Sequence, residues 1–165
     1  MTELDRVGKF QLVIFDADDT LRRTTTPGQP CPHRSGEWEL IPGVRETLSQ
    51  LPWDDPSGPR LGLASNQDQV AYGFLTSEMA RRLLRDLALA ATGLAPADAA
   101  LQLCPHALDV QCDCRKPNPG MLLRIMEHYG VGPEETVFVG NDSSDCEAAQ
   151  RAGVSFLWAD KLFRR

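Results

Sequence analysis

The chain contains several short runs of apolar residues in which β-favouring side chains predominate. Each run is too short for a typical helix, and the first three end directly before polar residues. These runs predict buried β-strands at residues 11–15, 61–64, 136–140 and 154–159.

Between these runs, apolar residues recur at helical spacing. The clearest segment is 76–91, where apolar side chains fall on one face and arginines on the other. Asn118 and Pro119 predict an N-cap and a first-turn proline for a helix that Gly130 ends. The pattern as a whole predicts helices at 44–51, 76–91, 120–129 and 145–152.

Strands and helices alternate along the chain, which predicts an α/β fold. We expect one doubly wound, Rossmann-like parallel sheet with helices on both faces. A length of 165 residues favours a single domain, 1–165. The segments 22–43 and 52–59 are rich in Pro, Gly, Ser and Thr and are expected to be irregular.

Polar residues follow three of the predicted strands. Because the carboxyl ends of parallel strands meet at one edge of a sheet, one crevice should collect Asp16, Asp18, Ser65, Asn66, Asn141 and Asp142. Asp16 and Asp18 would repel each other unless a cation joins them or one is protonated. Mg²⁺ prefers oxygen ligands and leaves positions open for a phosphate oxygen. The pair therefore predicts a magnesium site where one carboxylate attacks phosphorus and the other serves as acid and base.

Charge narrows the range of partners. The net charge of -6 disfavours broad binding to nucleic acids or anionic membranes, because both select basic surfaces. No apolar run approaches the roughly 20 residues of a membrane-spanning helix, and the first residues do not have the pattern of a signal peptide. We therefore expect a cytoplasmic location and no membrane partner.

Four separated pieces of the sequence resemble, in order, the motifs of the haloacid dehalogenase-like phosphatases. They are "DADDT" at 16–20, "SN" at 65–66, Lys116 and "VGNDSSD" at 139–145. The resemblance runs from about residue 10 to residue 158. It implies a magnesium-dependent phosphatase acting on a small phosphorylated metabolite. No segment between the motifs is long enough to form the cap domain that many relatives carry.

The resemblance implies a role for each matching residue. Asp16 would be the nucleophile that forms an aspartyl-phosphate, and Asp18 the acid that protonates the leaving alcohol and then activates water. Ser65, supported by Asn66, would hydrogen-bond the phosphoryl group, and Lys116 would stabilise the charge of the nucleophile and phosphate. Magnesium would be held by Asp16, the Asp18 carbonyl and a residue of the fourth motif.

Two positions depart from the family pattern. Asp19 stands where the family usually has Gly, and Asn141 stands where it usually has Asp. Loss of that carboxylate would weaken the magnesium site unless Asp142 takes the position. Both Asn141 and Asp142 are therefore candidate magnesium ligands.

A compact metal-binding pattern precedes Lys116. It supplies three thiolates and one imidazole, the ligand set of a closed tetrahedral zinc site: Cys104, His106, Cys112 and Cys114. A full ligand shell leaves no position for water, so the zinc would be structural. By fixing the loop 104–114, it would direct Arg115 and Lys116 at the phosphate crevice. Cys31 and His33 are expected to lie near substrate rather than on a second metal, since they lack further partners.

A zinc loop that ends in "CDCRKP" is similar to the branch containing histidinol-phosphate phosphatases and heptose 1,7-bisphosphate 7-phosphatases. In that branch the position of Arg115 contacts substrate. "SNQD" is more like the histidinol-phosphate type and "KPNPGM" more like the heptose type, so both substrates stay open. The alternatives are a polynucleotide 3'-phosphatase, which the acidic charge disfavours, and a non-catalytic zinc-stabilised interaction module that lost its magnesium site at Asn141.

Overall fold

A computed structural model describes residues 1–165 and confirms the predicted α/β class. Its centre is a five-stranded, all-parallel sheet in the order β5-β4-β1-β6-β7. These strands are β1 (Leu12–Phe15), β4 (Arg60–Asn66), β5 (Leu101–Cys104), β6 (Thr136–Gly140) and β7 (Ser155–Trp158).

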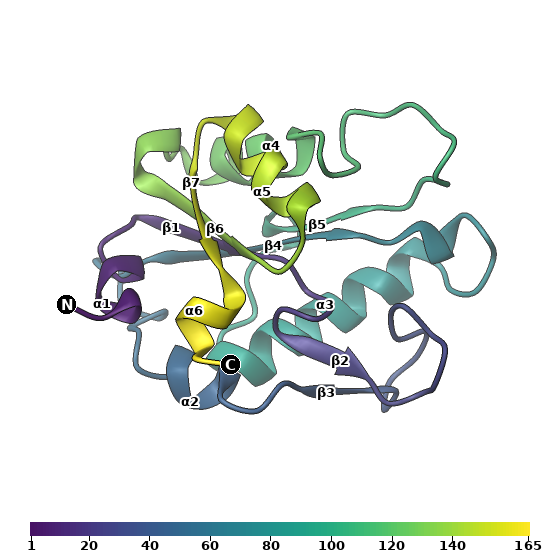
Figure 1. The fold of residues 1–165 in the computed structure, drawn as a ribbon, viewed down its shortest axis with the longest axis horizontal. Coiled ribbons are helices and arrows are strands. Elements are labelled where there is room, and N and C mark those ends of the chain that lie inside the picture. Colours follow the sequence, from purple (N-terminus) through teal and green to yellow (C-terminus); the bar gives the residue numbers. More distant parts are fainter.

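Helices cover both faces of this sheet (Figure 1). On one face lie α4 (Gly120–Tyr129) and α5 (Ser143–Ala152). The other face carries α1 (Glu3–Val7), α2 (Val44–Leu48), α3 (Ser77–Thr92) and α6 (Ala159–Phe163). Since side chains alternate along a strand, β1 serves both cores. Leu12 and Ile14 pack with α4 and α5, whereas Val13 and Phe15 pack with α2 and α3.

The start of α4 differs from the expectation. Asn118 does not cap the helix, because Pro119 occupies the N-cap position and the helix begins at Gly120. The Asn118 amide instead donates to the Cys112 carbonyl at 2.7 Å. A Cβ at Gly120 would lie 2.4 Å from the Asp113 carbonyl oxygen, so only glycine fits this close approach. The polar groups before α4 therefore secure the preceding loop rather than the helix.

Several short elements were not predicted. β5 was missed, and so was a small antiparallel pair, β2 (Arg22–Thr24) and β3 (Trp38–Leu40), inside the segment expected to be irregular. Neither three-residue strand is long enough to show an alternating pattern, and tertiary contacts decide their pairing. The segment 52–59 does contain only turns and irregular structure. β4 continues through Ser65 and Asn66, which makes these polar residues part of the sheet rather than of a loop.

Candidate active site

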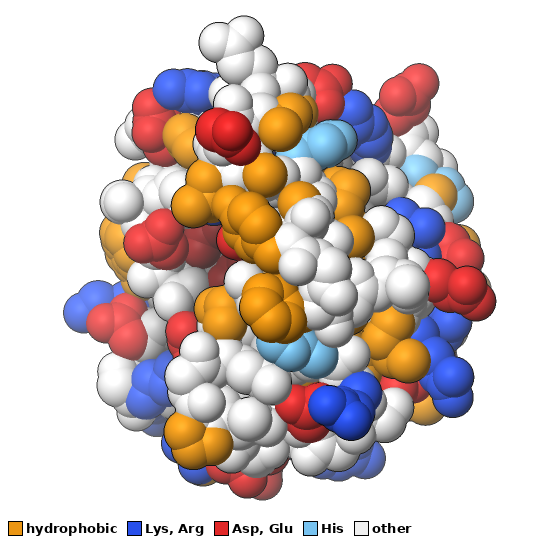
Figure 2. Space-filling model, turned by 90° about the vertical axis from the view of Figure 1, so that its right-hand side faces the viewer, with side chains coloured by type: hydrophobic (Ala, Val, Ile, Leu, Met, Phe, Trp, Pro, Cys, Tyr) orange, Lys and Arg blue, Asp and Glu red, His pale blue; other side chains and the backbone are white.

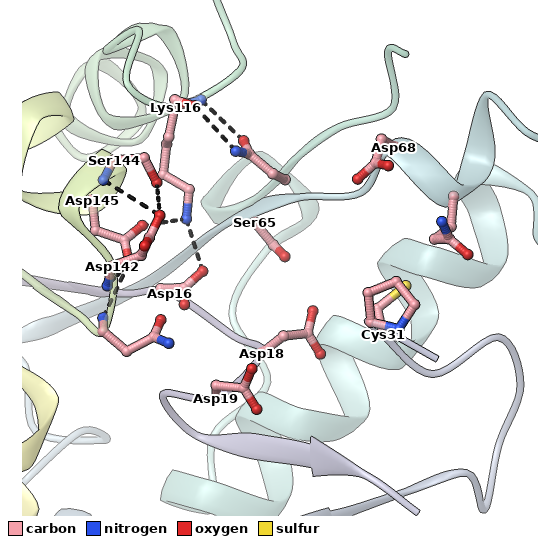
Figure 3. Close-up of a pocket in the computed structure, with 14 residues that line it drawn as sticks. Asp16, Asp18, Asp19, Cys31, Ser65, Asp68, Lys116, Asp142, Ser144 and Asp145 are labelled. Carbon is pink, nitrogen blue, oxygen red and sulfur yellow. Dashed lines mark hydrogen bonds and ion pairs between the residues drawn. The ribbon is translucent and has the colours of Figure 1, made fainter. Parts of the chain in front are cut away.

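The carboxyl ends of the central strands open onto a cavity of about 300 Å³ (Figure 3). Only one of its 14 lining residues is hydrophobic. The cavity brings together seven of the residues that the sequence singled out: Asp16, Asp18, Ser65, Asn66, Lys116, Asn141 and Asp142. The strand order explains this, because β4, β1 and β6 are neighbours in the sheet and end at the same edge.

At the centre of the cavity, one buried ammonium group joins two carboxylates. Lys116 Nζ lies 2.7 Å from Asp16 Oδ1 and 2.7 Å from Asp145 Oδ1, and it donates to the Ala64 carbonyl at 2.9 Å. Lys116 and Asp145 are almost wholly buried, and Asp16 is 7% exposed. The cation is thus held directly against one oxygen of the residue expected to be the nucleophile.

Burial and neighbouring charges set the ionisation of this group. Burial raises the pKa of Asp16 to about 6; the Lys116 ammonium opposes this rise and the Asp145 carboxylate adds to it. For Lys116, burial favours the neutral amine, but Asp16 and Asp145 outweigh it and raise the pKa. Lys116 therefore remains a cation, although two carboxylates and one ammonium leave the buried cluster with a surplus of negative charge.

The second motif fixes the backbone that carries Lys116. The Asn66 amide donates to the Lys116 carbonyl at 3.2 Å and accepts from the Lys116 N–H at 3.0 Å. This pair of bonds ties the end of β4 to the loop before α4. Ser65 points into the cavity and its Oγ accepts a hydrogen bond from the Gln67 amide at 2.7 Å. Its hydroxyl proton is free to face an anion in the cavity.

The oxygen atoms beside Asp16 fit a magnesium ion. Thr20 Oγ1 lies 3.0 Å from Asp16 Oδ2 and 3.2 Å from Asn141 Oδ1, so a carboxylate oxygen and an amide oxygen face the same small space. Oxygen donors are what Mg²⁺ requires. The Asp142 carboxylate is engaged elsewhere, since it accepts from Ser144 Oγ at 2.6 Å and caps α5. This arrangement favours Asn141 over Asp142 as the fourth-motif ligand.

The cysteine and histidine pattern is assembled into one cluster. The four ligand atoms, one from each of Cys104, His106, Cys112 and Cys114, all lie within 4.8 Å of one another. Sγ of Cys104 is 3.7 Å from Sγ of Cys112, close to the roughly 3.8 Å spacing of two sulfurs that lie 2.3 Å from a tetrahedral zinc ion. The sulfurs of Cys104 and Cys114 are closer, at 3.0 Å, and would move apart around an ion. The donor set and the compact cluster fit zinc.

The protonation of the thiols supports the same interpretation. Burial raises the pKa of Cys104 and Cys114. The neighbouring sulfurs of Cys104 and Cys112 raise the pKa of Cys114 further, whereas for Cys104 hydrogen bonds with Cys114 and the His106 backbone oppose the rise and Cys112 adds to it. For Cys112, burial acts in the same direction, but hydrogen bonds from the Arg115 and Cys114 N–H groups and from the neighbouring thiols lower its pKa to about 7. A metal ion would displace the remaining protons and relieve the crowding of sulfur atoms.

Comparison with known proteins places the chain in a family. A family model described as haloacid dehalogenase-like hydrolase matches residues 33–153. The chain belongs to the haloacid dehalogenase-like hydrolase family. This confirms the family resemblance, and the matched span contains the second, third and fourth motifs; the first motif, at 16–20, precedes it, and the structure places residues of all four around one cavity.

The relatives of this haloacid dehalogenase-like chain include sugar phosphatases. It is 39% identical over 121 residues to a D-glycero-beta-D-manno-heptose-1,7-bisphosphate 7-phosphatase of Pseudomonas putida, covering 72% of this chain and 66% of that protein, just under two thirds of its length. It is 35% identical over 150 residues to the Pseudomonas aeruginosa protein of the same name, covering 89% and 73%. A phosphatase of Mycobacterium tuberculosis, named for the alpha anomer, is 26% identical over 92% of this chain and 77% of that protein. These relatives identify the chain as a phosphoric monoester hydrolase.

A solved structure agrees with this family. The crystal structure of D,D-heptose 1,7-bisphosphate phosphatase from B. bronchiseptica, complexed with magnesium and phosphate, matches with a TM-score of 0.70 at 29% identity. The match covers 88% of this chain and 78% of that chain. No helix of the present structure is long and apolar enough to cross a membrane.

Sequence reasoning missed three site residues of this haloacid dehalogenase-like hydrolase. Asp145 closes the fourth motif, pairs with Lys116 and accepts from the Asn141 and Asp142 N–H groups, each at 3.1 Å. Its signal was present, because Asp145 shares the buried face of α5 with the alanines at 148, 149 and 152. Arg22 and Gln67 both contact Asp18 but are not among the residues to which the family motifs assign a role, although Arg22 is four residues from Asp18 and Gln67 directly follows Asn66.

The two departures from the family pattern have clear structural settings. Asp19 has a φ of +65°, the left-handed region where glycine is favoured and aspartate is tolerated. Asn141 Oδ1 accepts from Thr20 Oγ1 at 3.2 Å. The aspartate at 19 thus adopts the conformation that the usual glycine supplies, at some cost in strain, and adds a carboxylate to the cavity wall.

The rim of the cavity holds the remaining candidates. Arg115 does not line the cavity. Its Nη1 lies 3.8 Å from Oδ1 of Asp68, and Asp68 is a lining residue. Cys31 lines it as well, and His33 reaches Gln69 at 3.2 Å and stacks on Phe74. Cys31 and His33 thus lie beside the cavity, away from the four-ligand cluster. Figure 2 shows apolar side chains gathered on this side of the molecule next to a recess that contains acidic groups.

Proposed function

We propose that the chain is a magnesium-dependent phosphatase that hydrolyses a small sugar phosphate of the heptose 1,7-bisphosphate type. The observation that supports this most directly is the ion pair between Lys116 Nζ and Asp16 Oδ1, at 2.7 Å. It lies inside an acidic cavity that Ser65 and Asn141 also line. This cluster provides a carboxylate nucleophile, a fixed cation for the phosphoryl charge and oxygen donors for a divalent ion. The names of the relatives support the substrate class.

The proposed reaction divides into two displacements. An oxygen of Asp16 attacks phosphorus, the bond to the leaving oxygen breaks, and Asp18 gives its proton to that oxygen. Asp18 then accepts a proton from a water molecule, which attacks the phosphorus of the aspartyl-phosphate and restores Asp16. Lys116 and the Ser65 hydroxyl face the phosphoryl oxygens throughout, where a fixed charge and a fixed dipole stabilise the transition state.

Asp16, the Asp18 carbonyl and Asn141 would hold the magnesium ion. When bound, the ion neutralises charge on the phosphoryl oxygens and on the nucleophile. Asn141 supplies a neutral oxygen donor, so the site carries one negative charge fewer than a site with aspartate at this position. A weakened affinity for Mg²⁺ follows from that difference, and no step requires a second carboxylate there.

The zinc cluster has a structural role in this proposal. Cys104 ends β5 and Cys114 stands two residues before Lys116, so one ion would secure both ends of the loop. With four protein ligands it would have no open coordination position for water or substrate. Zinc would thereby hold the backbone of Arg115 and Lys116 in place, together with the Asn66 bonds to Lys116.

The test is phosphate release by protein of known metal content. The substrates are both anomers of heptose 1,7-bisphosphate, histidinol phosphate and a 3'-phosphorylated oligonucleotide, each with and without Mg²⁺. We expect one heptose anomer to exceed the other substrates by at least about tenfold in kcat/KM. Asp16→Asn should abolish turnover, whereas Asp54→Asn should retain it, because Asp54 is exposed and does not line the cavity.

Each other result assigns a different function. Preference for histidinol phosphate would keep the phosphatase and change the substrate. Preference for the oligonucleotide would indicate a polynucleotide 3'-phosphatase. No turnover of any substrate by zinc-loaded protein with Mg²⁺ would overturn the proposal and favour an interaction module.

A further inference from the structure

The structure holds the Asp18 carboxylate with three N–H donors from two buried residues. Arg22 Nε donates to Asp18 Oδ1 at 2.8 Å and Arg22 Nη2 to Asp18 Oδ2 at 3.3 Å. The Gln67 amide donates to the same Oδ2 at 3.0 Å and to Ser65 Oγ at 2.7 Å. Arg22 and Gln67 are each 1% exposed, whereas the Asp18 side chain is 18% exposed and lines the cavity.

Arg22 is an unusual residue to find at this depth. It is the largest almost fully buried side chain of the protein, and Asp18 is its only ion-pair partner. Its Nη1 has no hydrogen-bond partner within the protein. Burying a guanidinium costs free energy when it has only one carboxylate partner and one donor without a protein partner. An apolar side chain of similar size at position 22 would make the fold at least as stable.

The local backbone does not need this guanidinium. The turn after β1 is closed by main-chain bonds from Leu21 and Arg22 N–H to the Ala17 carbonyl, and from Asp19 N–H to the Arg22 carbonyl. These bonds would form with almost any side chain at position 22. The arginine side chain instead orients Asp18, because the two parallel N–H donors of a guanidinium fix both the position and the plane of a carboxylate.

We propose that Arg22 is a positioning residue for proton transfer to the leaving group, acting through Asp18. The inference rests on the proposed function. Oδ1 accepts only the bond from Arg22 Nε, so its second lone pair can carry the proton while Arg22 and Gln67 keep the carboxyl group in place. As the bond between phosphorus and the leaving oxygen breaks, that proton passes from Oδ1 to the leaving oxygen. Asp18 recovers a proton later from the attacking water, and Arg22 neither gains nor loses one.

Leaving-group dependence distinguishes this role from a purely structural one. The probes are 4-nitrophenyl phosphate, whose leaving group needs little protonation, and phenyl phosphate, whose phenolate is as basic as a tyrosinate, with a pKa of about 10. Their shapes are similar, and kcat/KM reports only the steps up to release of the alcohol. We expect Arg22→Gln to lower kcat/KM for phenyl phosphate about tenfold more than for 4-nitrophenyl phosphate, part of the 10²–10⁴ that general acids supply.

The neighbouring arginine provides a matched control. Arg23 is half exposed and pairs with Glu39 on the surface, so Arg23→Gln should leave both rates unchanged. If Arg22→Gln does not fold, Arg22→Lys keeps the cation without the fork and should show the same selective loss. Equal loss for the two substrates, or no loss, in the folded variant would overturn the proposal. Absence of turnover in the unmodified enzyme would instead count against the proposed function itself.

Discussion

At the scale of single residues, Asn141 decides how tightly the site can hold magnesium. Asn141 Oδ1 and Asp16 Oδ2 both accept from Thr20 Oγ1, so they face the same small space. A carboxylate at position 141 would therefore face the same magnesium ion as Asp16. We expect Asn141→Asp to lower the Mg²⁺ concentration for half-maximal activity about tenfold, equivalent to about 1.4 kcal/mol of binding free energy. A magnesium titration of phosphate release measures this.

The adjacent residue gives the comparison. Asp142 caps α5 through Ser144, and asparagine is an equally good N-cap, so Asp142→Asn should change neither stability nor magnesium dependence by much. A raised magnesium requirement in Asp142→Asn, with none of the expected gain in Asn141→Asp, would assign the ligand to Asp142 instead.

Asp19 allows a test of backbone strain. Its φ of +65° disfavours residues with a Cβ, and β-branched side chains most of all. We expect Asp19→Val to be less stable than Asp19→Gly by about 1–2 kcal/mol in the free energy of unfolding. Chemical denaturation of the two variants measures the difference, and equal stabilities would show that the turn relaxes at no cost.

The residues that sequence reasoning placed correctly in the cavity all follow strands or belong to short motifs. Two of the three that it missed depend on contacts between distant segments, whereas Arg22 contacts Asp18 only four positions away. Gln67 reaches Asp18 across 49 positions, and Lys116 meets Asp145 from separate elements. A pattern of apolar positions carries no information about such polar partners, because their contacts are set by the order of strands in the sheet.

At the scale of elements, the loop between β5 and α4 depends on its metal ligands. We expect Cys112→Ser to lose zinc and to lower the melting temperature by roughly 10 °C, since a domain of this size loses 2–4 °C per kcal/mol. Activity should fall too, because Lys116 follows the loop. Zinc analysis, thermal unfolding and phosphate release measure the three effects.

Cys146→Ser is the control for this change, since Cys146 lies on α5 outside the four-ligand cluster. It should keep its zinc, stability and activity. If Cys112→Ser behaved like Cys146→Ser, the cluster would not be a zinc site. The ligand spacing was readable from the sequence, but β5 was not, because a four-residue strand next to a metal loop lacks turn signals of its own.

At the scale of the whole molecule, the cavity concentrates negative charge in the fold. Asp16 has an ordinary pKa of 3.8, and burial raises it to about 6 in the folded chain. Between these values the folded state binds more protons at Asp16 than the unfolded state does, so its contribution to stability falls as pH rises through this window. The stabilisation that protonated Asp16 gives the folded state is fully present below pH 3.8 and is lost above about pH 6.

Comparison with Asp16→Asn isolates this effect from other carboxylates such as Asp142, whose lowered pKa acts in the opposite direction at lower pH. In magnesium-free buffer, the free energy of unfolding of the unmodified protein minus that of the variant should decrease from pH 4 to pH 6. Saturating Mg²⁺ should remove the decrease, because the ion binds ionised Asp16, and should add about 2.7 kcal/mol at 100 times its Kd. Denaturation at several pH values tests both. An unchanged difference without Mg²⁺ would mean that Lys116 alone neutralises Asp16, and the fold would then need no metal ion to tolerate its own active site.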